Sequence, residues 1–342
     1  MDSVLLLNQS HTNNIGDIAI GKSMESWIKI NGWNPITLPF WDEHAVFGHF
    51  AYTLVSLIIK IVPFLSNLII GKWVEKAVET VTQTTSIRFA AIGGGELFCS
   101  HKGFNAVFSC WVKALTTRGI PCCVIGVSGD ESLSTIQIRR NAKALEKCFL
   151  VGVRDGNSQK VFEKLYSVHP SVSPDVVFLL GKKDDVASER DTVICIPLSI
   201  NTKRSKKKEN YSLEYYYHLV ERTRHGKRVV FTATEQRDQE YTESLCRRIN
   251  TTYDTDYEFV PYLGYDGFCE MLCSSSIVIS GRMHALILGL LCGCKIQAVP
   301  IKQKLRVFDE EYGKCDDVEA VVNSTRKSFS RYTEIIRIYT SE

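Results

Sequence analysis

An arginine and a histidine, Arg282 and His284, directly follow the apolar run Ile277–Ile279 and the pair Ser280-Gly281. An apolar helical pattern begins immediately after them. A strand that ends here would deliver both side chains to the first turn of a helix, where α/β proteins commonly bind anions. An arginine can grip a carboxylate or phosphate with two parallel hydrogen bonds, and a histidine can transfer a proton near neutral pH. This spacing indicates an enzyme that acts on an anionic substrate.

Two other polar segments are expected at strand ends in the first half of the chain. Asn13–Asp17 follows the first predicted strand and opens a helix, with Gly16 permitting a tight turn and Asn14 or Asp17 able to cap the helix. Gly93–Gly95 follows another strand and would let the backbone approach a ligand closely. A plain capped turn and a tight strand-to-helix turn are the structural alternatives.

Further cations are expected at two more strand ends. Arg154 follows Val151–Val153, and Asp155 is placed to cap the next helix; a surface ion pair is the alternative interpretation. Lys302 and Lys304 follow the last predicted strand, where a second cation near Arg282 would suit a doubly charged phosphate. A pair of solvated lysines is the structural alternative. Glu235 and Glu243 are interpreted as a solvated helix face.

These motifs need a scaffold in which strands alternate with helices, and the hydrophobic pattern supplies one. Such alternation predicts parallel sheets covered on both faces, and ligands of such sheets bind beyond the carboxyl ends of the strands. We therefore expect an α/β fold of two Rossmann-like, doubly wound domains facing a cleft. The predicted parts are residues 1–183 with an apolar helical segment at 45–82, residues 190–316, and a helical tail at 317–342.

The expected strands are Ser3–Leu7, Pro35–Leu38, Phe89–Ile92, Cys122–Val127, Phe149–Val153, Val193–Pro197, Arg228–Phe231, Glu258–Val260, Ile277–Ile279 and Lys295–Val299, with Val176–Leu180 closing the first half.

Composition excludes several classes of protein. A length of 342 residues with 44% hydrophobic residues is enough for two soluble domains, and a net charge of +3 is too small to indicate a nucleic-acid-binding protein. The chain shows no secretory signal pattern at its start, and its 12 cysteines lie mostly in apolar runs. We expect reduced thiols in a cytoplasmic protein and no structural metal site, because no two Cys-x-x-Cys pairs match.

Two segments leave a membrane contact open. Residues 51–70 are mostly apolar but contain Lys60 and Pro63, which favours a buried helix pair or a helix on a membrane surface over a spanning helix. Residues 203–208 form the densest basic run, which is typical of a mobile loop and could also dock on anionic lipid.

In their order along the chain, these motifs resemble the polysaccharide pyruvyltransferase family. The resemblance spans roughly residues 3–312 and rests on the turn at Asn14–Asp17, the triple glycine, Val153–Asp155, Pro174-Asp175, Ser280–His284 and a segment around Lys304. The Ser-Gly-Arg-x-His element at 280–284 is the most specific of these. The chain departs from the family in having no proline after Gly126 and no recognisable motif in residues 41–75.

The resemblance implies a glycosyltransferase-B-like arrangement and transfer of pyruvate from phosphoenolpyruvate to a sugar as a ketal. No metal or other cofactor is implied. The N-terminal domain would face the acceptor and the C-terminal domain phosphoenolpyruvate. Arg154 and Arg282 would hold the donor's charged groups with Lys304 as a third cation, and His284 would protonate the methylene carbon. The residues expected to contact substrate are Asn14, Gly16, Asp17, Gly93, Gly94, Gly95, Ser280, Gly281, Met283 and Lys304.

The sequence leaves the acceptor and two rival functions open. The implied acceptor is a sugar of a cell-surface polysaccharide or of its polyprenyl-linked precursor, and a lipid-linked acceptor would account for the segments at 51–70 and 203–208. The base for the acceptor hydroxyl is His284 acting twice or Asp17. The alternatives are a nucleotide-sugar-dependent glycosyltransferase of the same architecture and a non-catalytic binding protein that keeps the fold.

Overall fold

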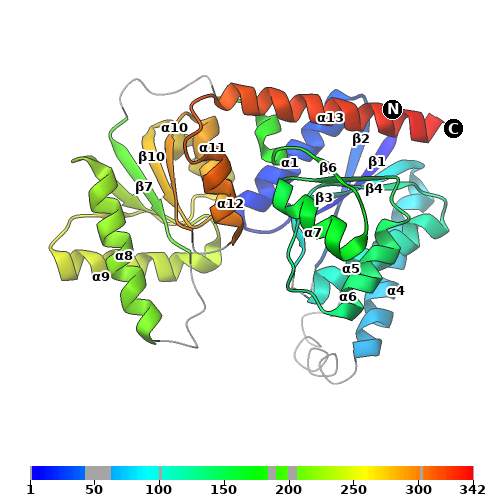
Figure 1. Cartoon of the computed structure of the whole chain (residues 1–342), viewed down its shortest axis with the longest axis horizontal. Coiled ribbons are helices and arrows are strands. Elements are labelled where there is room, and N and C mark those ends of the chain that lie inside the picture. The colour runs from blue at the N-terminus through cyan, green and yellow to red at the C-terminus, as the bar shows by residue number, and fades with distance from the viewer. Residues whose placement is uncertain are drawn as a thin grey trace. The chain divides into compact units, whose positions relative to one another are not determined.

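The chain folds into two compact units, each built on one parallel sheet (Figure 1). The computed structural model describes residues 2–42, 63–99, 102–183, 190–198, 206–300 and 303–341. Unit 1 comprises residues 1–11, 20–179 and 323–342, and unit 2 comprises residues 12–19 and 180–322. The prediction of an α/β fold with two parallel sheets is confirmed.

The sheet of unit 1 has the strand order β2-β1-β3-β4-β5-β6. The order changes direction between β1 and β3, so the ends of these two strands form the topological switch point of this sheet. The strands are β1 (Ser3–Asn8), β2 (Asn34–Pro39), β3 (Ile87–Phe98), β4 (Cys122–Gly129), β5 (Leu150–Val153) and β6 (Ser171–Val172).

Helices cover both faces of this sheet, so its strands are buried on both sides. One core joins Leu5 and Leu7 of β1 to Trp111 and to residues of α4 such as Val74. Side chains that alternate with these point to the other face, where Trp33 packs edge-on against Phe89 and Trp27 against Phe329. The helices are α1 (Ile15–Ile30), α4 (Pro63–Thr84), α5 (Lys102–Thr117), α6 (Thr135–Leu145), α7 (Gly156–Tyr166), the 3-10 turn η1 (Val176–Leu180) and α13 (Val318–Ser341).

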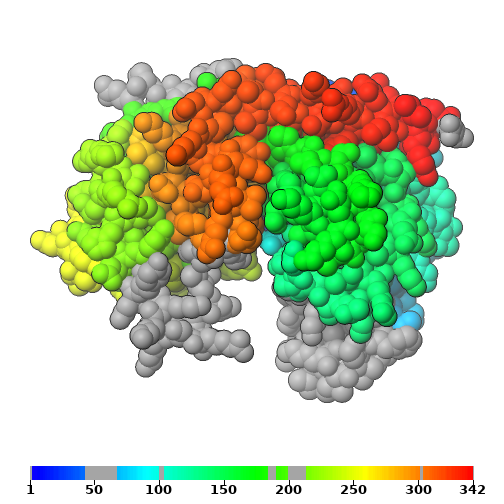
Figure 2. All heavy atoms as spheres, viewed as in Figure 1, coloured from blue at the N-terminus to red at the C-terminus, as the bar shows by residue number. Residues whose placement is uncertain are grey.

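Helix α13 contributes its residues from Asn323 onward to unit 1. Its Phe329 lies against Trp27, whose indole Nε1 donates to Thr333 Oγ1 at 3.1 Å. Figure 2 shows this part of the helix, in red, as a continuous strip on the surface of unit 1. The predicted helical tail therefore forms as α13, and its C-terminal portion completes the core of the N-terminal unit.

The sheet of unit 2 has the order β11-β10-β7-β8-β9 and changes direction between β7 and β10. Its core brings Val193 and Ile279 together with Leu219 and Leu245 from the covering helices. The strands are β7 (Thr192–Ile196), β8 (Arg228–Phe231), β9 (Glu258–Phe259), β10 (Ser275–Ser280) and β11 (Lys295–Ala298); the helices are α8 (Lys206–Arg224), η2 (Gln236–Asp238), α9 (Gln239–Tyr253), α10 (Gly264–Cys273), α11 (Met283–Leu291) and α12 (Gln303–Tyr312).

The structure corrects two predictions in the first half. Strand β3 does not end at Ile92 but continues through Gly93–Gly95 to Phe98, so the triple glycine is part of the sheet and not a turn after it. Gly94 and Gly95 have φ angles of +79° and +88°, which accounts for glycine at both positions. Residues 176–180 form a 3-10 turn where a closing strand was predicted.

The two segments considered for membrane contact fall largely outside the described residues. This holds for residues 51–62 and 203–205, whereas 63–70 open α4 and 206–208 open α8, where a mobile loop was predicted. Within the described part of the chain, no helix is long and apolar enough to cross a bilayer.

Gly93 is expected to be a packing requirement of the sheet. A Cβ at this position would overlap the carbonyl oxygen of Ile125 on β4, and backbone cannot move aside as a side chain can. Gly93→Ala should therefore lower the free energy of unfolding by about 3 kcal/mol or more in urea denaturation. Gly71→Ala is the control, because Gly71 lies in α4 with open space around it and should be stabilised by roughly 0.5–1 kcal/mol.

Candidate functional site

The loop before α1 is bound to the loop after β8, within unit 2. Asn14 forms an isolated antiparallel bridge with Glu235, and the N–H of Ile15 donates to the carbonyl of Thr234 at 2.9 Å. The N–H of Gly16 donates to Asn14 Oδ1 at 2.9 Å, so the asparagine shapes the turn as predicted. These bonds fix the first turn of α1 against the second sheet.

His284 packs on this turn from α11. Its imidazole lies so close to Gly16 that a Cβ on the glycine would overlap Nδ1 and lie 2.9 Å from Cγ. The Nε2 atom of His284 is buried. Gly16 was predicted to permit a tight turn, but it lies in the first turn of α1 without a positive φ angle. The structure instead requires glycine here because the imidazole occupies the space of a side chain.

Asp17 lies near enough to His284 for their charges to interact. Burial raises the pKa of Asp17 above its ordinary value, while His284, the hydrogen bond from Thr12 and the charge of Lys304 lower it, and Glu235 raises it. Thr12 Oγ1 donates to Asp17 Oδ2 at 3.1 Å. A carboxyl group so placed takes up its proton at a higher pH than an exposed aspartate does.

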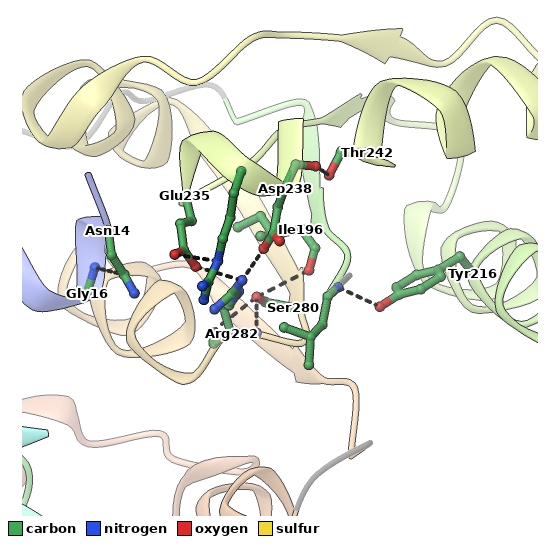
Figure 3. Close-up of polar contacts among 11 residues, drawn as sticks. Asn14, Gly16, Ile196, Tyr216, Glu235, Asp238, Thr242, Ser280 and Arg282 are labelled. Atoms are coloured by element: carbon green, nitrogen blue, oxygen red, sulfur yellow. Dashed lines mark hydrogen bonds and ion pairs between the residues drawn. The ribbon is translucent and has the colours of Figure 1, made fainter. Parts of the chain in front are cut away.

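Arg282 lies between two carboxylates (Figure 3). Its Nη2 is 2.9 Å from Glu235 Oε2 and also donates to Asp238 Oδ2. Its backbone N–H donates to Ser280 Oγ at 2.8 Å, which holds the turn between β10 and α11. Glu235 bonds a second guanidinium as well, with Arg237 Nε at 2.6 Å. The charges therefore alternate in sign along a chain of four side chains, and their sum is zero. This chain of charges consists of Arg237, Glu235, Arg282 and Asp238.

Sequence reasoning missed both carboxylates of this chain of charges. Glu235 was predicted on a solvated helix face, but its side chain is 15% exposed and it precedes η2. Glu243 does lie exposed on α9, where it pairs with Arg247. Glu235 follows the end of β8, so the rule that selected polar residues at strand ends would also have found it.

The remaining residues of the 280–284 element are internal. The side chain of Ser280 is fully buried, and its hydroxyl is used by the backbone of Arg282. Met283 is 8% exposed, and a Cβ at Gly281 would lie 2.8 Å from Leu198 Cβ. These residues shape the turn that presents Arg282 and His284.

Arg154 lies in unit 1 and is 4% exposed. Its Nη1 pairs with Asp175 at 3.2 Å and its Nε lies 3.7 Å from Asp155, so it forms a buried ion pair where a surface pair was the alternative. Asp155 Oδ1 accepts the N–H of Ser158 at 2.6 Å and caps α7, as predicted. Nε and Nη2 of Arg154 make no hydrogen bond among the described residues.

The structure thus brings together the predicted residues of unit 2: Asn14, Gly16, Asp17, Ser280, Gly281, Arg282, Met283, His284 and Lys304. Arg282 and His284 follow β10, at the switch point between β10 and β7. Gly93–Gly95 and Arg154 belong to unit 1, where the glycines lie in β3 at the other switch point. The described part of the chain contains no group of three or more His, Cys, Asp or Glu side chains placed to hold a metal ion.

Comparison with known families identifies the family of the chain. A model of the polysaccharide pyruvyl transferase family matches residues 14–296, which is most of the chain. The chain belongs to the polysaccharide pyruvyl transferase family. The match begins at Asn14 and includes Arg154 and the 280–284 element, so it contains every predicted site residue except Lys304. No curated protein sequence matches the chain.

Solved structures share the fold of this pyruvyl transferase family member at very low sequence identity. UDP-GlcNAc 2-epimerase from Methanocaldococcus jannaschii matches with a TM-score of 0.55 at 8% identity, covering 95% of this chain and 92% of its own. Trehalose-6-phosphate synthase OtsA matches with a TM-score of 0.54 at 10% identity, covering 100% and 97%. Anabaena HepE, solved with UDP and glucose, matches at 0.51 and 10% identity, covering 99% and 97%. The predicted glycosyltransferase-B-like class is confirmed.

The buried pair of Arg154 and Asp175 should be a large stabilising element of unit 1. Asp175→Asn leaves the guanidinium without its counter-charge in a site closed to water, which costs about 3–5 kcal/mol of unfolding free energy. Glu131→Gln is the matched control, because Glu131 pairs with Lys164 at 3.1 Å on the surface and should cost below about 1 kcal/mol. Equal effects of the two substitutions in urea denaturation would contradict this assignment.

Gly16 should control the position of His284. Gly16→Ala places a methyl group where the imidazole lies, so the ring must move away from the first turn of α1. We expect a changed chemical shift of the His284 ring nitrogens in NMR spectra of the ¹⁵N-labelled imidazoles. Gly156→Ala, at the open start of α7, should leave those chemical shifts unchanged.

Proposed function

We propose that this protein transfers pyruvate from phosphoenolpyruvate to a sugar of a cell-surface polysaccharide, or of its lipid-linked precursor, and forms a pyruvate ketal. Family membership supports the reaction class. The observation that carries the mechanism is the contact of the His284 imidazole with Gly16 beside Asp17, at the switch point of unit 2. In the proposed site, His284 is the acid, and the carboxylate of Asp17 is the counter-charge of its protonated form.

In the proposed first step, the His284 imidazolium protonates the methylene carbon of phosphoenolpyruvate. The electron pair of the carbon–carbon double bond forms the new C–H bond, and C2 becomes a cation that shares charge with the ester oxygen. Asp17 stabilises the imidazolium before transfer, and the donor's own carboxylate stabilises C2 afterwards. General acid catalysis of this kind contributes typically about 10²–10⁴-fold to a rate.

In the second step, one acceptor hydroxyl attacks C2 and gives its proton to the now neutral His284. The bond from C2 to the phosphate oxygen then breaks, and phosphate leaves with the electron pair. A second hydroxyl of the same sugar adds to C2, and its proton leaves with the phosphate. One proton is therefore taken up at the methyl carbon and one by phosphate, which balances the two hydroxyl protons.

The donor's negative charges require cations, and Arg282 and Lys304 of unit 2 are proposed to supply them. Arg282 uses Nη2 for Glu235 and Asp238, and a guanidinium has five donors in all. The role of Arg154, which is buried in unit 1, stays a prediction. Unit 2 is therefore proposed as the phosphoenolpyruvate side of the enzyme. The enzyme itself is proposed to be cytoplasmic, with a peripheral membrane contact.

Acceptor-dependent phosphate release tests the proposal directly. The protein is mixed with phosphoenolpyruvate and a galactoside, mannoside, glucoside or N-acetylmannosaminide, and inorganic phosphate is measured with mass detection of the ketal. His284→Ala should lower kcat about 10²–10⁴-fold. Because the pKa of Asp17 is raised, the acidic limb of the wild-type profile should lie above the ordinary aspartate range. Asp17→Asn should remove that limb and reduce kcat.

His218→Ala is the control, since His218 is exposed on α8 and pairs only loosely with Glu214 at 3.9 Å. It should retain wild-type kcat. Full activity of His284→Ala would exclude the proposed acid. Thermal stabilisation by UDP but not by phosphoenolpyruvate would instead favour the nucleotide-sugar glycosyltransferase.

A further inference from the structure

A hollow of about 370 Å³ opens in unit 2 next to the chain of charges around Arg282. It is lined by Asn13, Glu235, Gln236 and Arg237. Its volume lies in the range of small-ligand sites, which is about 300–1,000 Å³. In the mechanism described above, Glu235 serves only to hold Arg282, and the other three side chains have no role.

The residues that line the hollow are all of polar types, and their charges sum to zero. Glu235 and Arg237 neutralise each other through a 2.6 Å ion pair, and Asn13 Nδ2 donates to Gln236 Oε1 at 3.1 Å. Such a wall offers carboxylate and amide oxygens as acceptors and guanidinium and amide N–H groups as donors. This chemistry suits a neutral ligand rich in hydroxyl groups and not a multiply charged anion such as phosphoenolpyruvate.

The backbone of Glu235, which lines the hollow, connects it to the first turn of α1, where Asp17 and His284 lie close together. Glu235 bridges to Asn14, whose Oδ1 accepts the N–H of Gly16. Its charge also acts on Asp17, and its Oε2 pairs with Arg282. A ligand that touches Glu235 is therefore next to the residues that are proposed to carry out the transfer.

We infer that this hollow is the acceptor subsite and that it binds a neutral pyranose ring of the glycan. Glu235 accepts a hydrogen bond from the hydroxyl that will attack, and Asn13, Gln236 and Arg237 hold further hydroxyls of the same ring. The assignment of this sugar as the acceptor of the reaction rests on the proposed function, whereas the binding of a neutral sugar in the hollow does not. Asn13 belongs to the N-terminal segment that was expected on the acceptor side, although it groups with unit 2.

Saturation-transfer NMR tests the binding without any turnover. The probes are the methyl glycosides of galactose, mannose, glucose and N-acetylmannosamine at tens of millimolar, each with wild-type protein and with Asn13→Ala/Gln236→Ala. These two side chains bond each other and not Arg282, so their removal leaves the chain of charges in place. We expect at least one glycoside to bind wild-type protein and its saturation signal to fall at least fivefold in the double variant.

Glu235→Gln and Glu243→Gln form a matched pair for the kinetic test. Both glutamates pair with an arginine, but Glu243 lies on the exposed face of α9, away from the hollow's lining. Glu235→Gln should raise the acceptor KM about tenfold or more and the phosphoenolpyruvate KM less than twofold. Glu243→Gln should change neither KM. A Glu235→Asp enzyme should have an acceptor KM between that of the wild type and that of Glu235→Gln.

Each outcome bears on one proposal or the other. Absence of binding by every glycoside, or equal binding by wild type and the double variant, would overturn the subsite. A rise in the phosphoenolpyruvate KM of Glu235→Gln with an unchanged acceptor KM would also overturn it and make Glu235 a support of Arg282 alone. Glycoside binding that depends on Asn13 and Gln236, without any phosphate release, would uphold the subsite and reject pyruvyl transfer.

Discussion

The charge of Arg282 is the constraint around which unit 2 is arranged. A guanidinium that is 20% exposed is costly unless carboxylates and hydrogen bonds compensate for lost water. Two loops supply that compensation through Glu235 and Asp238, and Ser280 fixes the backbone from which the arginine extends. The strand-to-helix turn that presents His284 is consequently held by the same ion pairs that hold Arg282.

Glu235 holds two arginines and also lines the hollow. One oxygen holds Arg282 and the other holds Arg237, while the carboxylate as a whole borders the hollow. The proposed donor site and the proposed acceptor subsite thus meet at one carboxylate.

Much of this architecture could be predicted from local pattern because parallel strands buried on both faces leave strong apolar runs. The element at 280–284 was recognisable for the same reason: Arg and His end such a run, where side chains must leave the sheet. The extension of β3 through Gly93–Gly95 was not predictable by that logic, since three glycines normally indicate a turn. Only the neighbouring backbone at Ile125 shows why glycine is needed inside the sheet.

The partners of the site residues were also beyond reach of the sequence. Nothing near Arg154 indicates that Asp175 will enclose it, because that pairing depends on how β5 and η1 fold back together. Asp238 and Glu235 likewise lie far from Arg282 in the sequence, and only the fold brings them close to it. Strand-end position predicts where polar groups gather, but not which charges cancel.

The contact between Gly16 and His284 has a consequence for the history of this chain. The two positions lie near opposite ends of the sequence, yet they occupy a single volume. A side chain at position 16 requires His284 either to move or to be replaced by a smaller residue, so substitutions at the two positions are coupled. A descendant that loses the glycine is therefore expected to have displaced the imidazole or lost it.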